Sequence, residues 1–246
     1  MLTYTPLNIA ISGYGKMGKT VEKQAITSGH SIECILDNNT EDWSMAATAS
    51  VLIDFSTPEA APQNIERAFQ LGIPVVCGTT GWWQHLSEIQ SLCEKHNGTL
   101  IYGGNFSIGM NILFKLNAEL ANWMNAFEAY DPWILEKHHA AKKDGPGGSA
   151  LQLGQTIIQH LDRKNMIQKD SLSLRAPIAE ELSISFVRTG HIIGEHEVGY
   201  SGPHDEIRIT HQAHSREGFA NGAIWAAEKI QSLSGIIDFQ SLFQKL

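Results

Sequence analysis

The densest group of reactive side chains in the sequence is the segment 136–149, EKHHAAKKDGPGGS. It contains two neighbouring histidines, His138 and His139, and then Lys142, ahead of a Gly- and Pro-rich loop that leads into a helix predicted to begin near Ser149. Histidine is the usual proton donor near neutral pH, and a nearby lysine supplies positive charge or a second proton. The start of the predicted helix offers N–H groups to an anion such as a carboxylate. These features predict proton transfer to a bound acid; the alternative is a structural pair of histidines that caps a strand beside solvated lysines.

A glycine loop near the start of the chain predicts nucleotide binding. Residues 13–18 read GYGKMG, the pattern G-x-G-x-x-G, between a predicted strand at 8–12 and a predicted helix. In a dinucleotide-binding unit the first glycine makes a tight turn, the second admits a pyrophosphate and the third lets the helix pack on the strand. Extended through Lys19 and Thr20, the loop also satisfies the phosphate-binding pattern G-x-x-x-x-G-K-[ST], for which Asp54 would hold magnesium. The two interpretations predict hydride transfer and phosphoryl transfer, respectively.

Asp37 favours the dinucleotide interpretation over phosphoryl transfer, and over a glycine turn without a ligand. It ends the second predicted strand, about 20 residues after the third glycine, where dinucleotide-binding folds place an acid against the adenosine ribose. Asn38 and Asn39 follow it, so no Lys or Arg stands there to receive the extra phosphate of NADPH. The sequence therefore predicts that NADH is used at least as well as NADPH, with Lys16 the one cation of the loop available to NADPH.

The elements that must position these residues begin with alternating strands and helices. Short apolar strands are predicted at 8–12, 31–36, 50–55, 73–77 and 100–102, and the helix after the third strand is predicted to start at Thr57 and run to about Leu71. Strands that alternate with helices indicate right-handed crossovers and a parallel sheet covered on both faces.

The pattern changes after residue 105. A helix is predicted at 108–126 and a strand at 133–137, and strands at 171–175, 182–189, 191–200 and 206–214 then follow one another without helices, before a last helix at 216–232. Successive strands indicate a mixed or antiparallel sheet. We therefore predict an α/β protein with a Rossmann-type dinucleotide-binding domain, residues 1–106 and 216–246, and an α+β substrate-binding and oligomerisation domain with a mixed sheet, residues 107–215.

Composition excludes several other classes of protein. The formal net charge is −8, which argues against a nucleic-acid partner because such proteins hold phosphates with clustered Lys and Arg. No apolar run approaches the roughly 20 residues that span a bilayer, and the first residues show no secretory signal, so no membrane partner is expected. Three separated cysteines fit a reducing cytoplasm. No metal is expected at His211 and His214, because a spacing of three in a strand points side chains to opposite faces.

The ordered motifs together resemble one family. The segment 136–149 resembles the signature E-x-H-H-x-x-K-x-D-x-P-S-G-T-A of the 4-hydroxy-tetrahydrodipicolinate (dihydrodipicolinate) reductases, and the resemblance extends along most of the chain. It includes GYGKMG at 13–18, DFSTP at 54–58, GTTG at 78–81, NFSIG at 105–109, RTG at 188–190, GEH at 194–196, SR at 215–216 and FANG at 219–222. Several ordered motifs on one chain are more specific than any single one, and they remove the phosphoryl-transfer interpretation.

The resemblance implies an activity and a set of site residues. The family reduces a ring double bond in a cyclic dicarboxylate of diaminopimelate and lysine biosynthesis with NADH or NADPH, and forms a homotetramer. It implies that His138 is the proton donor, Lys142 a second donor and His139 a substrate contact. It further implies that Gly148 and Ser149 bind a substrate carboxylate and that the cofactor is bound by Gly13, Tyr14, Gly15, Lys16, Met17, Gly18, Asp37, Gly78, Thr79, Thr80, Gly104, Asn105, Phe106 and Ser107. Two positions depart from the family pattern, since Gly147 and Ser149 stand where the family commonly has Ser and Thr.

Two other functions are consistent with the same sequence. One is a nicotinamide-dependent oxidoreductase of similar architecture that acts on a different small acid. The other is an NAD-binding or redox-sensing protein without catalytic activity. The three are distinguished by whether the protein oxidises NADH, and with which acid.

Overall fold

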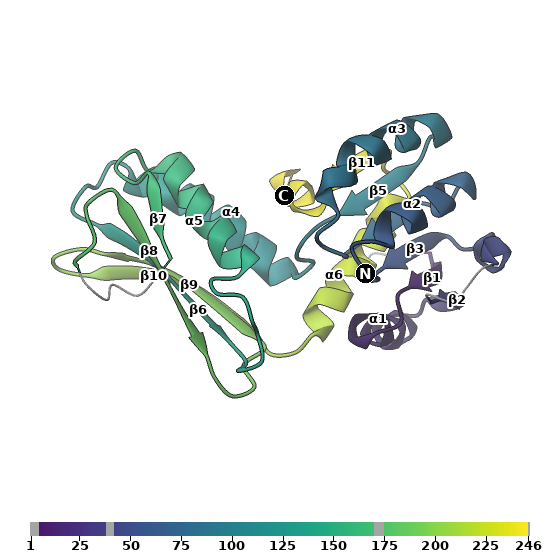
Figure 1. Cartoon of the computed structure of the whole chain (residues 1–246), viewed down its shortest axis with the longest axis horizontal. Coiled ribbons are helices and arrows are strands. Elements are labelled where there is room, and N and C mark those ends of the chain that lie inside the picture. Colours follow the sequence, from purple (N-terminus) through teal and green to yellow (C-terminus); the bar gives the residue numbers. More distant parts are fainter. Residues whose placement is uncertain (1–4, 38–41, 170–174, 246) are drawn as a thin grey trace. The chain divides into compact units, whose positions relative to one another are not determined.

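The structure is a computed structural model that describes residues 5–37, 42–169 and 175–245 (Figure 1). Asn38, Asn39 and most of the predicted strand 171–175 lie outside the described residues. The chain forms two compact units: unit 1 comprises Met1–Ile108 and Arg216–Leu246, and unit 2 comprises Gly109–Ser215. Among the described residues, none of the helices has both the length and the apolar character that crossing a membrane requires.

Unit 1 contains a six-stranded sheet in the order β11-β5-β4-β3-β1-β2, and all its strand pairs are parallel. β1 (Asn8–Ser12) and β2 (Ser31–Leu36) have the predicted bounds, and β3 (Val51–Asp54), β4 (Val75–Cys77) and β5 (Thr99–Tyr102) lie within two residues of theirs. The short edge strand β11 (Gly235–Asp238) was not predicted; it extends the sheet beyond β5. The predicted Rossmann-type parallel sheet is confirmed.

Helices cover both faces of this sheet (Figure 1). α1 (Lys16–Thr27) and α6 (Glu217–Ile230) contribute buried residues such as Val21 and Ile224 to one apolar cluster. α2 (Ala61–Gln70) and α3 (Leu86–His96) contribute Ile65 and Ile89 to a second cluster. The strands between them read as continuous apolar runs because both of their faces are buried. Helices therefore pack on both faces of the sheet. Because its strands are parallel, their carboxyl ends lie along one edge.

The start of α2 differs from the prediction. The helix begins at Ala61, not at Thr57, and Pro62 takes a place in its first turn. Thr57 caps a preceding turn instead, since its Oγ1 accepts from the N–H of Ala60 at 3.3 Å. Before this turn, the hydroxyl of Ser56 donates to the carboxylate of Asp54 at the end of β3. Residues 55–57 therefore form a loop at the edge of the sheet.

Unit 2 contains the predicted mixed sheet, in the order β10-β9-β6-β8-β7. β8 (Glu181–Arg188) is parallel to β6 (Asp131–His138) and to β7 (Met166–Gln168), whereas β9 (Gly194–Ser201) is antiparallel to β6 and to β10 (Glu206–Ala213). α4 (Ile108–Met124) and α5 (Gly148–His160) cover one face of the sheet through a single apolar cluster. β7 was not predicted, because three residues are too few to show strand periodicity.

One ion pair at the start of β8 predicts a pH dependence of stability. Arg175 donates to both carboxylate oxygens of Glu181, at 2.8 and 2.5 Å, and these hydrogen bonds lower the pKa of Glu181 to about 2. A carboxyl whose pKa is lower in the folded than in the unfolded chain stabilises the fold above its unfolded pKa, and this stabilisation is lost as the pH falls toward 2. We expect Glu181→Gln to lower the Tm at pH 7, and the difference from wild type to shrink by pH 3.

Thermal melts followed by circular dichroism at pH 7, 5, 4 and 3 measure this difference. The control is Glu180→Gln, which removes an exposed neighbouring carboxylate and is expected to leave the Tm unchanged at each pH. A difference between Glu181→Gln and wild type that grows toward low pH contradicts the assignment.

Candidate active site

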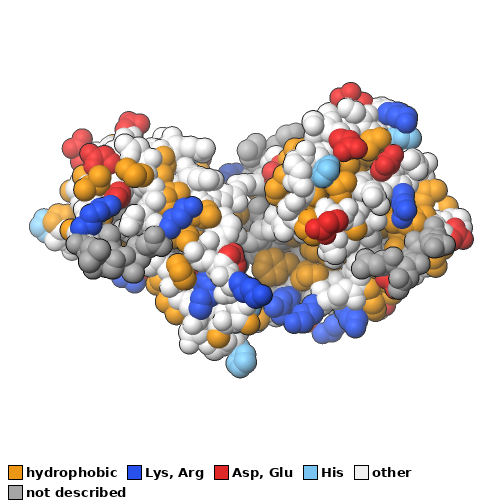
Figure 2. Space-filling model, in the orientation of Figure 1, with side chains coloured by type: hydrophobic (Ala, Val, Ile, Leu, Met, Phe, Trp, Pro, Cys, Tyr) orange, Lys and Arg blue, Asp and Glu red, His pale blue; other side chains and the backbone are white. Residues whose placement is uncertain are grey.

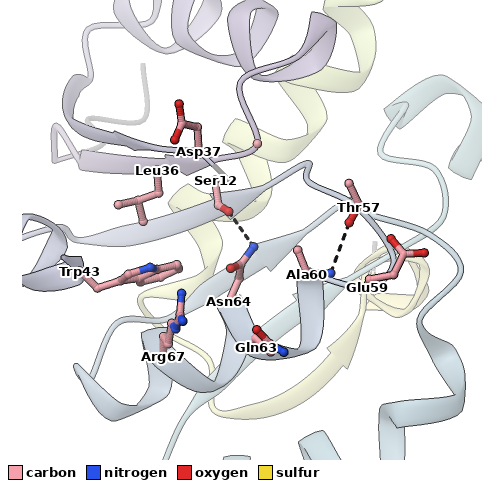
Figure 3. A pocket seen from close by; sticks show the side chains of 11 residues that line it. Ser12, Leu36, Asp37, Trp43, Thr57, Glu59, Ala60, Gln63, Asn64 and Arg67 are labelled. Carbon is pink, nitrogen blue, oxygen red and sulfur yellow. Dashed lines mark hydrogen bonds between the residues drawn. The ribbon is translucent and has the colours of Figure 1, made fainter. Parts of the chain in front are cut away.

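The carboxyl ends of the strands in unit 1 border a groove. β2 and β3 lie on opposite sides of β1, so the order of strands reverses there, at the position where open α/β sheets bind ligands. Two cavities, of about 560 and 440 Å³, share Gly13, Asp37 and Thr57 among their lining residues. Residues of α2, among them Asn64 and Arg67, line the larger one, as Figure 3 shows. Residues of the glycine loop and Asp37 thus line one continuous groove.

Each glycine of the loop has the property that its predicted role requires. Gly13 has a φ of +83°, and a Cβ there would lie 2.4 Å from the carbonyl oxygen of Phe55. A Cβ at Gly18 would lie 2.2 Å from the carbonyl oxygen of Gly13, so α1 packs against the turn too closely for a side chain. A Cβ at Gly15 would meet nothing within 4 Å, and Gly15 is the N-cap of α1. The turn and the helix packing leave open space in front of the helix N-terminus, where an anion is favoured.

Basic side chains surround this helix. In Figure 2, Lys and Arg side chains gather at the lower edge of unit 1, where α1 and α6 run, and α1 carries the exposed Lys16, Lys19 and Lys23. The ammonium of Lys19 lies 5.5 Å from the ring centre of Tyr14, and the hydroxyl of Thr20 donates to the carbonyl of Lys16. Lys19 is therefore an exposed residue of the helix, and Thr20 is half-buried beside it.

A buried carboxylate fixes the loops that follow the strands. Asp54 is fully buried and accepts hydrogen bonds from the hydroxyls of Ser56 and Thr79, at 3.0 and 2.5 Å, and from the amide of Asn64 at 2.9 Å. Its oxygens are therefore taken up by protein donors instead of a metal ion. Burial raises the pKa of the neighbouring Cys77 thiol, and Asp54 raises it further, so Cys77 stays protonated and inert.

The other predicted cofactor residues follow β4 and β5 at the same edge. The N–H of Gly78 donates to the carbonyl of Asp54 at 2.9 Å, and a Cβ at Gly78 would lie 2.2 Å from the ring of Phe55. Phe106 is buried, with its ring 4.4 Å from that of Phe239, whereas Thr80 and Gly104 are exposed. Met17 differs from the rest of the loop, because it packs against the apolar cluster under α1 and α6.

Two residues of the groove were missed by the sequence analysis. Trp43 and Arg67 line the larger cavity together with Asp37, and the guanidinium of Arg67 lies 5.5 Å from the ring centre of Trp43 (Figure 3). Only the spacing of Ala60, Gln63 and Arg67 could have indicated Arg67 from the sequence, because residues three and four apart share one face of a helix. Trp43 lies in a short 3₁₀ helix, Trp43–Ala46, that no motif marks.

In unit 2, the face of the sheet that packs against the helices becomes polar at one end. On β6 the side chains on this face change from Ile134 to Glu136 and then His138, because alternate residues of a strand share a face. The register pairs Glu136 with His196 of β9, and His138 with Arg188 of β8. The two parallel strands and their antiparallel neighbour therefore bring a carboxylate, two imidazoles and a guanidinium together.

Glu136 is the centre of this group. It is fully buried; Arg188 donates to its Oε1, and the N–H of Gly147 donates to its Oε2 at 2.8 Å. Nδ1 of His138 lies 3.4 Å from Oε1, and Nε2 of His196 lies 3.7 Å from Oε2. Burial alone would raise the pKa of Glu136, but the hydrogen bonds from Arg188 and Gly147 and the two nearby imidazoles outweigh it and hold that pKa far below its ordinary value. Glu136 is therefore ionised near neutral pH.

The same three side chains have the composition of a metal site. Glu136, His138 and His196 each present one ligand atom, all within 4.8 Å of one another. Both oxygens of Glu136 already accept hydrogen bonds, however, and the guanidinium of Arg188 adds a fixed positive charge beside them. This arrangement favours a proton-transfer group over a metal centre.

The loop before α5 carries the remaining predicted residues. Nζ of Lys142 lies 2.6 and 2.7 Å from the two carboxylate oxygens of Asp144, and Lys142 lowers the pKa of Asp144. A Cβ at Gly147 would lie 2.8 Å from Oε2 of Glu136 and 3.1 Å from Nζ of Lys142. A side chain at Gly147 would therefore crowd both Lys142 and Glu136. α5 begins at Gly148, which is exposed, and a Cβ there would meet nothing within 4 Å. His139, before the loop, and Ser149, after it, are half-buried.

Comparison with known proteins assigns the chain to a family. Residues 7–106 match the family described as dihydrodipicolinate reductase, N-terminus, and residues 109–243 match dihydrodipicolinate reductase, C-terminus. The chain belongs to the dihydrodipicolinate reductase family. A 4-hydroxy-tetrahydrodipicolinate reductase of Christiangramia forsetii is 38% identical over 98% of this chain and 99% of its own length. One of Archaeoglobus fulgidus is 35% identical over 91% of this chain and 94% of its own length.

A solved structure shows the same fold. A dipicolinate-bound dihydrodipicolinate reductase from Paenisporosarcina superposes with a TM-score of 0.75 at 21% identity, over 95% of this chain and 98% of that one. Membership of the reductase family makes the protein an oxidoreductase that acts on a small molecule. It also makes NADH or NADPH its cofactor.

Proposed function

We propose that the protein reduces 4-hydroxy-tetrahydrodipicolinate to tetrahydrodipicolinate with NADH or NADPH, in the biosynthesis of diaminopimelate and lysine. The observation that carries this proposal is the group around Glu136, which places His138 and Lys142 beside the N-terminus of α5. Proton donors next to an anion site are what reduction of a carboxylate-bearing ring requires. The curated relatives named for this reaction, and the related enzyme with dipicolinate bound, support the same substrate class.

In the proposed enzyme, residues 1–106 and 216–246 bind the cofactor and residues 107–215 bind the substrate. In unit 1, the turn at Gly13–Gly18 receives the pyrophosphate at the start of α1, and Asp37 binds the adenosine ribose. The nicotinamide side of the site is formed by Gly78, Thr79, Thr80, Gly104, Asn105, Phe106 and Ser107. When bound, the reduced nicotinamide supplies a hydride.

The residues of unit 2 hold the substrate and supply the proton. Gly148, Ser149 and His139 bind a substrate carboxylate at the start of α5, and Lys142 adds positive charge there. Addition of a hydride to a conjugated ring leaves an electron pair that must be protonated, and His138 delivers that proton. Because the product lacks the 4-hydroxyl group of the substrate, one water leaves in the overall reaction.

We further propose that the enzyme is a cytoplasmic homotetramer. α4 and α5 cover one face of the sheet of unit 2, whereas on the other face Val187 is exposed and Trp133 and Leu135 are half-buried. A second copy of this chain covers that face in the proposed assembly. The three cysteines are free, which suits a reducing compartment.

Asp37 predicts the choice between the two cofactors. Its exposed carboxylate borders the groove and would repel the additional phosphate of NADPH, although Arg67 lines the same cavity as a cation. We expect kcat/KM with NADH to equal or exceed that with NADPH, and Asp37→Asn to shift the ratio toward NADPH by roughly tenfold. Steady-state kinetics with both cofactors measure the ratio. Glu59→Gln, which removes another carboxylate of this cavity, is expected to shift it less, and a hundredfold preference of the wild type for NADPH contradicts the assignment.

The reductase assay tests the proposed function. The protein is mixed with NADH and the freshly formed cyclic product of pyruvate and aspartate semialdehyde, and the absorbance of NADH is followed. Rapid oxidation is expected. Binding of NADH without turnover would indicate a sensor, and turnover only with other acids would indicate a different dehydrogenase.

A further inference from the structure

Glu136 has no assigned role in the reaction, although it is the most deeply buried charge among the described residues of unit 2. A buried carboxylate is costly unless it is paired, so one that is kept next to two histidines requires an explanation. Its side chain is 0% exposed, and the side chain of His196 beside it is 8% exposed. Glu136 is covered by its partners and contacts His138 through the buried ring nitrogen Nδ1.

We propose, on the basis of the proposed function, that Glu136 is a positioning residue that holds His138 through Nδ1, so that Nε2 is the nitrogen that exchanges protons with the substrate. The hydrogen bond made by one ring nitrogen of a histidine determines which nitrogen carries the proton in the neutral ring. An acceptor fixed 3.4 Å from Nδ1 favours the tautomer with hydrogen on Nδ1. Nε2 is then the nitrogen without a proton in the neutral ring and the donor in the protonated one.

Two neighbours restrict the ring from its other sides. The rings of His138 and His196 meet edge to face, with centres 5.3 Å apart. On the Nε2 side lies Gly194, where a Cβ would come within 3.0 Å of Nε2. His196 therefore limits rotation of the His138 ring, and Gly194 leaves room at the nitrogen that must meet the substrate.

The protons balance in a complete cycle. Protonated His138 carries hydrogen on both nitrogens, and the Nε2–H bond breaks as a new bond forms to the substrate atom that holds the electron pair. The neutral ring keeps its Nδ1–H toward Oε1 of Glu136. A proton from water then returns to Nε2, and Glu136 stays ionised throughout because its hydrogen bonds hold its pKa low.

Charged and titratable side chains on three strands and one loop lie close to this group. Arg188 of β8 pairs with Glu136, His196 of β9 contacts it, and the Lys142–Asp144 pair lies on the loop beside it. His211 of β10 pairs with His196 across the strands; burial first, and then His196 and His214, lower the pKa of His211 and favour its neutral form. Removing the Glu136 charge thus leaves Arg188 as an uncompensated cation next to His138, and like charges disfavour each other.

The decisive variant is Glu136→Gln, which keeps the shape of the side chain and removes its charge. We expect kcat to fall about tenfold to hundredfold, the alkaline limb of the kcat/KM profile to move to lower pH by about one unit, and the Kd for NADH to stay within about twofold. The control is Glu195→Gln, which breaks the Lys137–Glu195 pair (2.7 Å) on the opposite face of the same two strands and is expected to keep the wild-type profile. A wild-type rate, or a loss of rate that is equal at every pH, overturns the proposal.

A second variant covers the case in which Glu136→Gln does not fold. Gly194→Ala keeps every charge and crowds Nε2 of His138. It is expected to lower kcat about tenfold without moving the alkaline limb. A wild-type kcat for Gly194→Ala overturns the proposal in that case.

The tautomer can be measured without any turnover. Nitrogen-15 NMR of the histidine rings at alkaline pH is expected to show His138, identified by the loss of its signal in His138→Gln, with hydrogen on Nδ1. The opposite tautomer in the wild type overturns the positioning role even if the protein is an active reductase. The Nδ1–H tautomer in a protein without reductase activity supports the positioning role and contradicts only the proposed reaction.

Discussion

Replacement of His138 by Gln is expected to lower kcat by about 10²- to 10⁴-fold, the usual contribution of a positioned general acid, and to leave the Kd for NADH within about twofold. Gln fills a similar volume but carries no transferable proton, so the electron pair left by hydride addition has no donor. The two effects separate because His138 lies in unit 2, whereas the glycine loop lies in unit 1. Steady-state kinetics and fluorescence titration with NADH measure them.

The control for this variant is His204→Gln, an exposed histidine between β9 and β10 that has no assigned role. It is expected to retain the wild-type kcat. Turnover of His138→Gln at the wild-type rate would show that His138 is not the proton donor.

Two identical substitutions in the glycine loop are expected to have different effects. Gly15→Val fills the open space in front of α1, and because Gly15 has a φ of −79° the backbone accepts a side chain. The fold is expected to be kept and NADH binding to weaken about a hundredfold, since the valine occupies the place of the pyrophosphate. Gly18→Val instead places a side chain against the carbonyl oxygen of Gly13, which a Cβ already approaches to 2.2 Å, and is expected to lower the Tm by roughly 2–10 °C.

Isothermal titration with NADH and thermal melts of both variants measure the contrast. A Gly15→Val protein that binds NADH as tightly as the wild type would place the cofactor elsewhere. A Gly18→Val protein with an unchanged Tm would show that α1 does not depend on close packing at this residue.

Local patterns predicted most of unit 1 because its strands are buried on both faces. Apolar runs such as Val51–Ile53 stand out from their surroundings, and a glycine or proline marks most of their ends. The predicted start of α2 was wrong because Thr57 caps a turn before the helix, and Ser56 bonds to Asp54 in the loop that precedes this turn. β11 was missed because its four residues form a strand only by pairing with β5, which is far away in the sequence.

The site was predictable where its residues are close in sequence and not where the sheet register assembles it. The glycine loop and the segment 136–149 are continuous, so their chemistry can be read directly. His196 was given no role among the histidines of the strand-rich region, yet antiparallel pairing places it opposite Glu136. Likewise Trp43 and Arg67 meet in the groove only because the 3₁₀ helix and α2 converge there.

The transfer of hydrogen from cofactor to substrate is the most direct test of the whole account. NADH that carries deuterium at both hydrogen positions of C4 of the nicotinamide ring is incubated with the wild-type protein and the freshly formed cyclic substrate, and the product is analysed by mass spectrometry. The account predicts a product with one deuterium from NADH and one further hydrogen from solvent. A product without deuterium, or deuterated NADH recovered intact beside an unchanged substrate, would contradict it.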